Sequence, residues 1–527
     1  MKTKKLALNS LEKFVAAISP KWGQNRLKFK AFDSFYGASS SRRQLSQWKT
    51  TNKDADSDLL KELPYLRERS RDLVRNNPLA AGAINTNVTS VVGDGFKMRS
   101  RIDRDILGLE SEAANELENQ IEREWSLWAN NQDCSSNRSG NFDSILNLVF
   151  RNFLENGDVF VTTPRISRKN QPYSLRLQLL EGDRICNPGN TTDNDKTRGG
   201  ITFDSNGAPS IYHILKTHPG ASYTTDKNNW MDVQAFGRNT GLRQVIHIFE
   251  AKRPGQSRGM PYLAPVIESL KMLGKYTEAE IMSAVISGMF TVFIESESGD
   301  FLDQMSPTSE IGGSSSDEDY KIGPGAMVGL APGEKVSTAN PGRPNTAFDP
   351  FVQAILRQIG VALELPFELL IKHFTASYSA ARAALLEAWK MFRNRRKFLV
   401  DSFCNIIYEI WFYEAVAKGR INAPGFFTDP LLRQAYLGNE WIGSAQGQID
   451  PLKEINAAEK RLALSLTSRS YEAAQLNGSD WEKTMNQIEK EKMLLPDPII
   501  IEDNPDIEED EIEDEIGDLE DETLRNN

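Results

Sequence analysis

The stretch Lys372–Val400, "KHFTASYSAARAALLEAWKMFRNRRKFLV", joins a short polar loop directly to a strong helix-forming run. From Ala380 to Gly419 no proline and no internal glycine intervenes, so about 39 residues at 1.5 Å each predict one helix about 58 Å long. Ser377 or Ser379 is expected to cap its start. Its apolar residues recur in steps of three, four and seven, which predicts a buried face made of Leu385, Trp389, Phe392, Leu399, Phe403, Ile406 and Ile410.

Four basic residues stand in the middle of this predicted helix: Arg393, Arg395, Arg396 and Lys397. One interpretation is a solvated face or a set of salt bridges between subunits. The other is direct contact with DNA, since cations bind phosphates. The sequence leaves both open.

The net charge of the 527-residue chain is −11, and it is unevenly distributed. Residues 502–522 hold fourteen Asp and Glu and no Lys or Arg, a composition typical of a disordered segment. Removing these fourteen acids and Arg525 from the totals of 73 acidic and 62 basic residues leaves 59 and 61, a charge of +2. A protein that grips duplex DNA over a broad face usually has a marked basic excess, so such a protein is not expected.

Signals for metal binding, disulfides and membranes are absent from the sequence. Three widely spaced cysteines without a CxxC motif favour a reducing compartment, and four scattered histidines form no ligand motif, so we predict no metal site and no cofactor. The N-terminus has helical apolar spacing broken by polar residues, which predicts a basic amphipathic arm rather than a signal peptide. The longest apolar stretch, Ile281–Ile294, is too short for a membrane span, so no membrane partner is expected.

The first 255 residues or so predict an α+β domain. Helical spacing of Leu73, Ile84, Val88 and Val91 or Val92, and of Ile121, Trp125 and Trp128, is followed by strand-like segments and by a hairpin turning at residues 205–207.

A helix over about 262–289 and a second over about 351–363 then flank a stretch rich in Gly, Ser and acids, which indicates a helical hairpin carrying a small β module. Pro366 is expected to end the second helix. Shorter helices are predicted after Gly419, in 451–466 and 479–494.

Enzyme motifs are not found. "GLAPGEKVST" lacks the GK[ST] order of a phosphate-binding loop, and "GPGAMVG" has Val328 where GxGxxG needs its third glycine. The acid pairs Glu181 with Asp183 and Asp317 with Asp319 would suit Mg²⁺ for nuclease chemistry, although neighbouring acids in loops are usually solvated. We predict no catalytic residues.

Several segments in consistent order resemble the lambda-type portal proteins of tailed bacteriophages. They include "RSRDLVRNNPLAAGAI", "LQLLEGDRI", "GITFDSNGAPSIYHI", "RPGQSRG" at Arg253–Gly259 and "YSAARAALLE" at Tyr378–Glu387, and the resemblance runs from about 60 to 485. It implies a multi-domain α+β architecture and a ring, a dodecamer, at one capsid vertex with a central channel for double-stranded DNA.

The resemblance also implies names for the segments. They are a basic N-terminal arm (1–60), a wing (61–256), a stem helix (257–289), a clip (290–346), a second stem helix (347–364), a tunnel loop (365–379), the long helix (380–419), a crown of C-terminal helices (420–500) and an acidic disordered tail (501–527).

By the same analogy, Lys372, His373, Phe374 and Thr375 lie near the passing duplex, whereas a loop at an ordinary solvent surface with Phe374 in a subunit contact is the alternative. The partners implied are further copies of the chain, DNA, the terminase large subunit, the major capsid protein and a head-to-tail connector. The implied location is the virion, after assembly in the host cytoplasm. The competing class is a nuclease or ATPase of the packaging machinery.

Overall fold

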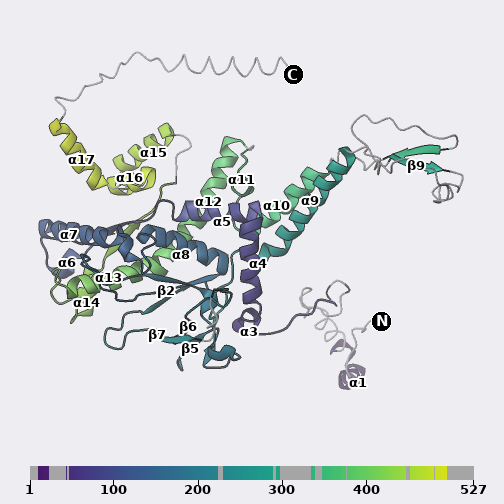
Figure 1. Cartoon of the computed structure of the whole chain (residues 1–527), viewed down its shortest axis with the longest axis horizontal. Coiled ribbons are helices and arrows are strands. Elements are labelled where there is room, and N and C mark those ends of the chain that lie inside the picture. Colours follow the sequence, from purple (N-terminus) through teal and green to yellow (C-terminus); the bar gives the residue numbers. More distant parts are fainter. Residues whose placement is uncertain are drawn as a thin grey trace, which may run out of the picture. The chain divides into compact units, whose positions relative to one another are not determined.

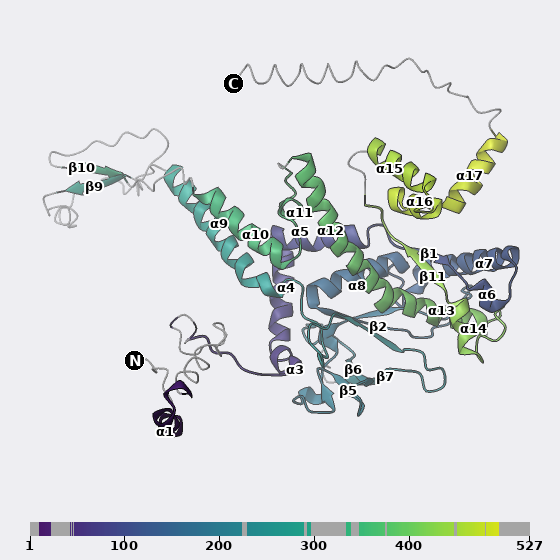
Figure 2. The ribbon, with the colours of Figure 1, turned by 180° about the vertical axis from the view of Figure 1, so that it is seen from behind.

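The structure is a computed structural model of the whole chain (Figures 1 and 2). It describes residues 10–22, 43, 45, 47–223, 229–288, 292–296, 334–338, 347–374, 377–446, 451–479 and 481–494. Thr375, the acid pair Asp317 with Asp319, most of the predicted clip and the acidic tail therefore lie outside the described residues. The chain divides into two units, residues 1–64 with 251–258, and residues 65–250 with 259–527. Within the described ranges, no helix is both long and apolar enough to cross a bilayer.

The smaller unit contains helix α1 (Ser10–Ile18), which confirms helical spacing in the basic arm, and the short helix α3 (Ala55–Leu59). The "RPGQSRG" stretch holds the segment around α3 in place. The Arg253 guanidinium donates to Asp58 at 2.6 Å and to the carbonyl of Lys53 at 2.8 Å, and the Ser257 amide donates to Asp56 at 2.7 Å. The first part of this stretch therefore has a structural role.

The larger unit is a mixed helix and strand fold whose main core lies among helices. These are α4 (Leu63–Asn76), α5 (Pro78–Val91), α6 (Arg104–Leu107), α7 (Ser111–Ala129) and α8 (Phe142–Asn156). Asn77 caps α5 by accepting from the amides of Leu79 and Ala80, and Pro78 stands at the first helical position, where its missing N–H costs nothing. The predicted apolar positions of α4, α5 and α7 are all buried.

Aromatic rings dominate the centre of this core. The ring of Trp125 on α7 lies 5.1–5.5 Å, centroid to centroid, from four others, those of Trp128, Phe142, Trp411 and Trp441. Such edge-on and tilted pairs add to the stabilisation that burial gives. The core thus joins residues more than 300 positions apart in the sequence.

Two antiparallel sheets face each other across a second, smaller core around Phe160, Leu180 and Tyr212. One has the order β3-β2-β8 and the other β4-β5-β6-β7. The strands are β2 (Asp158–Thr162), β3 (Gln178–Glu181), β4 (Thr197–Arg198), β5 (Ile201–Phe203), β6 (Pro209–Leu215), β7 (Trp230–Gln234) and β8 (Val245–Phe249). The predicted hairpin is confirmed as β5–β6, with its turn between Phe203 and Pro209.

The helical hairpin is also confirmed. Helix α9 (Ile267–Gly288) and helix α10 (Phe348–Ala362) lie side by side in Figures 1 and 2, and Tyr276 of α9 packs against Phe348 and Phe351 of α10 with ring centroids 5.6 and 5.3 Å apart. Beyond them, β9 (Val292–Ser296) pairs antiparallel with β10 (Glu334–Thr338). The two strands confirm the β structure that the sequence predicted between the two helices.

Three details after this hairpin differ from expectation. Helix α10 ends at Ala362, before Pro366, because Glu364 adopts a left-handed backbone (φ 56°), and Pro366 instead precedes a short helix α11 (Phe367–Ile371). The long helix is α12 (Tyr378–Leu399) and α13 (Asn405–Ala417), joined by a π-helical turn at Val400–Cys404. Ser377 occupies the N-cap position of α12 but its side chain makes no capping hydrogen bond.

The C-terminal part returns to the main core. Helix α14 (Pro430–Tyr436) leads to β11 (Asn439–Ile442), which pairs antiparallel with β1 (Lys97–Ser100), and the helices α15 (Pro451–Ala463), α16 (Arg469–Asn477) and α17 (Trp481–Leu494) follow. The helices expected at α15 and α17 are confirmed; β11 was not predicted.

Candidate functional site

The tip between α11 and α12 presents three side chains to solvent. Lys372 takes a left-handed backbone (φ 55°) that ends α11, and its amide donates to the carbonyl of Glu368. The amide of His373 donates to the same carbonyl at 3.1 Å. These bonds satisfy the carbonyl at the helix end and direct the chain outward, so the side chains of Lys372, His373 and Phe374 are exposed. Three of the four residues predicted to lie near DNA are therefore exposed at this tip, and the fourth, Thr375, lies outside the described residues.

The base of the tip is firmly packed. Leu365 and Leu370 are buried, and the Leu365 amide donates to the carbonyl of Gly360 at 2.9 Å. A Cβ on Gly360 would lie 2.7 Å from the Leu365 carbonyl oxygen, so only glycine allows this turn. Residues 367–371 of the predicted tunnel loop, 365–379, thus form a partly buried helical turn, and the exposed part begins at Lys372.

Arg396 of the basic cluster faces inward. Its guanidinium donates to the carbonyls of Val91 at 3.1 Å and Ser90 at 3.2 Å, at the C-terminal end of α5, and to the carbonyl of Ser444 at 3.0 Å. The last carbonyls of a helix lack partners within it and carry partial negative charge, so a cation is favourable there. Burial, with the charge of Arg393, lowers the pKa of Arg396.

Arg395 joins the base of the helical hairpin to the long helix. Its guanidinium lies 4.5 Å from the ring centroid of Tyr262, donates to Asn87 of α5, and lies 3.3 Å from a Glu364 carboxylate oxygen. The Tyr262 hydroxyl in turn donates to the carbonyl of Leu363. The residues where the hairpin leaves and re-enters the body are therefore held by one arginine.

Arg393 and Lys397 are exposed, and Lys397 makes an ion pair at 2.8 Å with Asp401 one turn along the helix. The predicted cluster therefore consists of two inward and two outward side chains. Both interpretations of the cluster, a solvated or intersubunit face and contact with DNA, need exposed side chains. Only Arg393 and Lys397 meet this requirement. The roles of Tyr262 and Asn87 were missed, and the only sequence signal was that Tyr262 follows the "RPGQSRG" stretch.

A buried ion-pair network that the sequence did not predict surrounds the start of β2. Arg67 of α4 donates to Asp158 at 2.6 Å and to the carbonyl of Asn156 at 3.0 Å. Here the backbones of Gly157 and Gly259 touch, since a Cβ on Gly259 would lie 1.9 Å from the Gly157 carbonyl oxygen. The second half of the "RPGQSRG" stretch thus needs its glycine for close approach.

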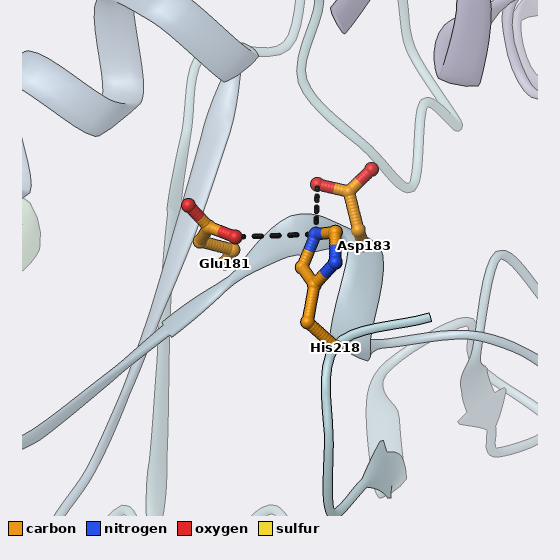
Figure 3. Close-up of side chains that lie close together, drawn as sticks. All are labelled: Glu181, Asp183 and His218. Carbon is orange, nitrogen blue, oxygen red and sulfur yellow. Dashed lines mark ion pairs between the residues drawn. The ribbon is translucent and has the colours of Figure 1, made fainter. Parts of the chain in front are cut away.

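Glu181, Asp183 and His218 form the one group of potential metal ligands that the described residues bring together (Figure 3). His218 Nε2 lies 3.2 Å from a Glu181 carboxylate oxygen and 3.9 Å from an Asp183 carboxylate oxygen, while Nδ1 accepts a hydrogen bond from the Gly220 amide. Asp183 also pairs with Arg71.

The charge of Asp183 is thus already balanced by the protein. Burial alone would raise the pKa of Asp183, but the charge of Arg67 and the hydrogen bond and charge of Arg71 outweigh it, so the pKa is lowered. The cluster is an ion-pair network that fastens β3 to α4. It does not offer the open arrangement of carboxylate oxygens that Mg²⁺ prefers.

Comparisons with known proteins place the chain in a family. The sequence model of "Phage portal protein, lambda family" matches residues 41–396, more than half of the chain. Portal protein B of Escherichia phage lambda is 27% identical over 482 residues, covering 87% of this chain and 89% of the relative. The portal protein of Escherichia phage N15 is 27% identical over 475 residues, covering 85% and 88%.

Among solved structures, a chain from the neck of an empty gene transfer agent particle is 11% identical with a TM-score of 0.42, and the match covers 82% of this chain and 98% of that chain. The family match and its coverage agree with the sequence resemblance on which the fold was predicted. The chain belongs to the lambda family of phage portal proteins.

Proposed function

We propose that this portal protein assembles into a dodecameric ring that conducts double-stranded DNA through its centre. The observation that carries the proposal is the uncovered apolar surface of the hairpin α9/α10. Six large apolar side chains on these two helices are exposed by 47% or more, among the described residues: Met272, Ile281, Met282, Val285, Phe351 and Val361.

An isolated chain gains nothing from exposing such side chains, and gathered apolar surface marks an interaction site. Val285 follows Ile281 by four residues and Met282 by three on α9, so its side chain lies on the same side of the helix as both. Burial against a neighbouring copy would stabilise a ring by roughly 25 cal/mol for each Å² of apolar surface removed from water. Further copies of the chain are thus the partners that this surface fits best.

The exposed tip at Lys372, His373 and Phe374 supports the second half of the proposal. One cation and one imidazole in each copy interact with phosphates without reading base sequence. Few contacts also suit transport, because each added phosphate contact strengthens binding and a channel must let DNA slide. The near-neutral body, +2 without the acidic tail, is consistent with such weak contact. Arg393 and Lys397 are the next candidates for contact with DNA or with a neighbouring subunit.

The remaining partners and the segment roles are part of the same proposal. The ring stands at one vertex of the capsid shell of the virion, in contact with the major capsid protein, after assembly in the host cytoplasm. The clip, residues 290–346, docks the terminase large subunit during packaging and a head-to-tail connector afterwards. The wing, stem helices, tunnel loop, long helix and crown keep the boundaries given above, and the protein acts without catalysis or cofactor.

Native mass measurement and negative-stain electron microscopy of the purified chain test ring formation. We expect ring particles with a central hole and the mass of twelve copies. The double substitution Ile281→Glu with Val285→Glu is expected to give folded subunits that no longer form rings, since two charges on each copy would have to be desolvated at the interface.

The matched control is Lys271→Glu on the same helix, an exposed position outside the apolar set, which should leave the rings unchanged. Circular dichroism of each variant establishes that the subunit is folded. Rings formed equally by wild type and by the double variant would refute the role of this surface. A monomer under all salt conditions tested would count against self-assembly of the ring.

A further inference from the structure

A cavity of about 730 Å³ lies between the two facing sheets and helix α13, away from the tip and from the hairpin α9/α10. Its walls come from the end of β2, from β3, β6 and β7, from the segment 240–244 and from α13. The volume is within the usual range for ligand sites, roughly 300–1,000 Å³. Nothing in the proposed function uses it.

The charged side chains that line this cavity are all basic. Its lining contains four basic residues, Arg165, Arg184, Lys216 and Arg243, and no Asp or Glu. Arg165 is neutralised by Glu414, and Arg184 donates to the carbonyls of Leu215 and Lys216 at 2.9 and 2.8 Å. Lys216 and Arg243 are exposed and form no ion pair with another described residue. They leave an uncompensated positive rim.

The floor of the cavity is apolar. Leu180 of β3 faces Ile214, Met231 and Val233 of β6 and β7, and Met231 is 47% exposed. On both β3 and β7 the lining residues alternate along the strand, so they belong to one face of each sheet. A ligand that fits both parts carries negative charge and branched aliphatic groups together.

We propose that the cavity binds the acidic C-terminal segment of the same chain, residues 502–522. This segment combines the two required chemistries, since its fourteen acids are interrupted by Ile507, Ile512, Ile516 and Leu519. The last described residue is Leu494, and the 33 residues from 495 to 527 can span up to about 100 Å.

Zero-length carbodiimide cross-linking of the full-length protein, with mass spectrometry, tests the contact directly. A carboxylate of the segment should form an amide with Lys216, whereas the exposed Lys196, which does not line the cavity, should react at a background level. Arg243→Glu should reduce the Lys216 cross-link about tenfold, because a like charge at the rim of the cavity repels the carboxylates of the segment. Arg238→Glu, at an exposed position outside the lining, is the matched control and should leave it unchanged.

Hydrogen–deuterium exchange gives an independent measurement. Amides of β7 should exchange faster in Arg243→Glu, and in a full-length variant whose fourteen acids are replaced by Asn or Gln, than in wild type or in Arg238→Glu. Cross-linking and exchange that are the same in Arg243→Glu and Arg238→Glu would overturn the proposal. Neither measurement depends on ring formation, so each result is separate from the test of the channel.

Discussion

At the scale of the residue, the side chain of Arg396 alone connects three segments of the chain. Its three hydrogen bonds to the carbonyls of Ser90, Val91 and Ser444 connect α12 both to the end of α5 and to the segment after β11. Gly443 lies against this guanidinium, since a Cβ there would be 2.7 Å from Arg396 Cζ. The role of Arg396 is therefore structural.

We expect Arg396→Ala to lower the free energy of unfolding by about 2–3 kcal/mol, because it leaves buried carbonyls without a donor. Arg393→Ala, at an exposed position three residues earlier, should change it by less than about 0.5 kcal/mol. Urea unfolding followed by circular dichroism measures both. Equal effects of the two substitutions would contradict the inward role of Arg396.

The basic cluster also shows the limit of sequence reasoning about single residues. Position along a helix gives the direction of a side chain relative to that helix, but the partner of Arg396 lies about 300 residues away in α5. No local sequence pattern indicates a partner so far away in the chain. The tip was predicted better, because a polar loop before a long helix is a local feature.

At the scale of the element, Glu414 fastens the segment before β3 to helix α13. Its carboxylate accepts from the amides of Ser174 at 2.5 Å and Leu175 at 2.9 Å, and pairs with Lys418 at 2.9 Å and with Arg165. Burial alone would raise the pKa of Glu414, but these donors outweigh it and lower the pKa. The carboxylate is thus stabilised in its charged form.

We expect Glu414→Gln to destabilise the protein at pH 7 by about 1–3 kcal/mol, since the substitution removes charge-assisted hydrogen bonds to buried amides. The lowered folded pKa means that the stabilisation is fully present above the ordinary carboxyl value of 4.5 and is lost as pH falls through the folded value. The difference between wild type and variant should therefore shrink in acid.

Thermal unfolding between pH 3 and pH 7 measures this difference. Asp401→Asn, which removes the exposed pair with Lys397, is the control and should cost less than about 0.5 kcal/mol. A difference between wild type and Glu414→Gln that is constant over this pH range would rule out the proposed charge state.

Elements with local signals were predictable and elements that depend on distant partners were not. The hairpin around residues 205–207 and the helices α9 and α10 follow from turn residues and apolar spacing. Strand β11 was missed, since it is four residues long and pairs with β1 about 340 residues earlier. The π-helical turn at Val400–Cys404 was missed because neither proline nor glycine marks it.

At the scale of the whole molecule, the tip and the apolar hairpin surface are separable in experiment. We expect Lys372→Ala with His373→Ala to leave ring assembly intact and to lower the fraction of DNA-filled heads, because both side chains are exposed and neither forms an ion pair with another described residue. Lys390→Ala, an exposed lysine on α12 paired with Glu387, is the control and should package normally. A normal yield of filled heads from the double variant would exclude the tip as a DNA contact.

The hairpin α9/α10 leaves and rejoins the rest of the unit at one point. There the Tyr262 hydroxyl donates a hydrogen bond to the Leu363 carbonyl, and the Arg395 guanidinium lies over the Tyr262 ring. The residues between Tyr262 and Leu363 are therefore an insertion in the fold. Packing in the rest of the unit does not determine how many residues this insertion contains. Lengthening such an excursion costs only about 0.6 kcal/mol per doubling of a flexible loop. A reporter domain inserted at the outer end of the hairpin should therefore leave the core of this protein unchanged.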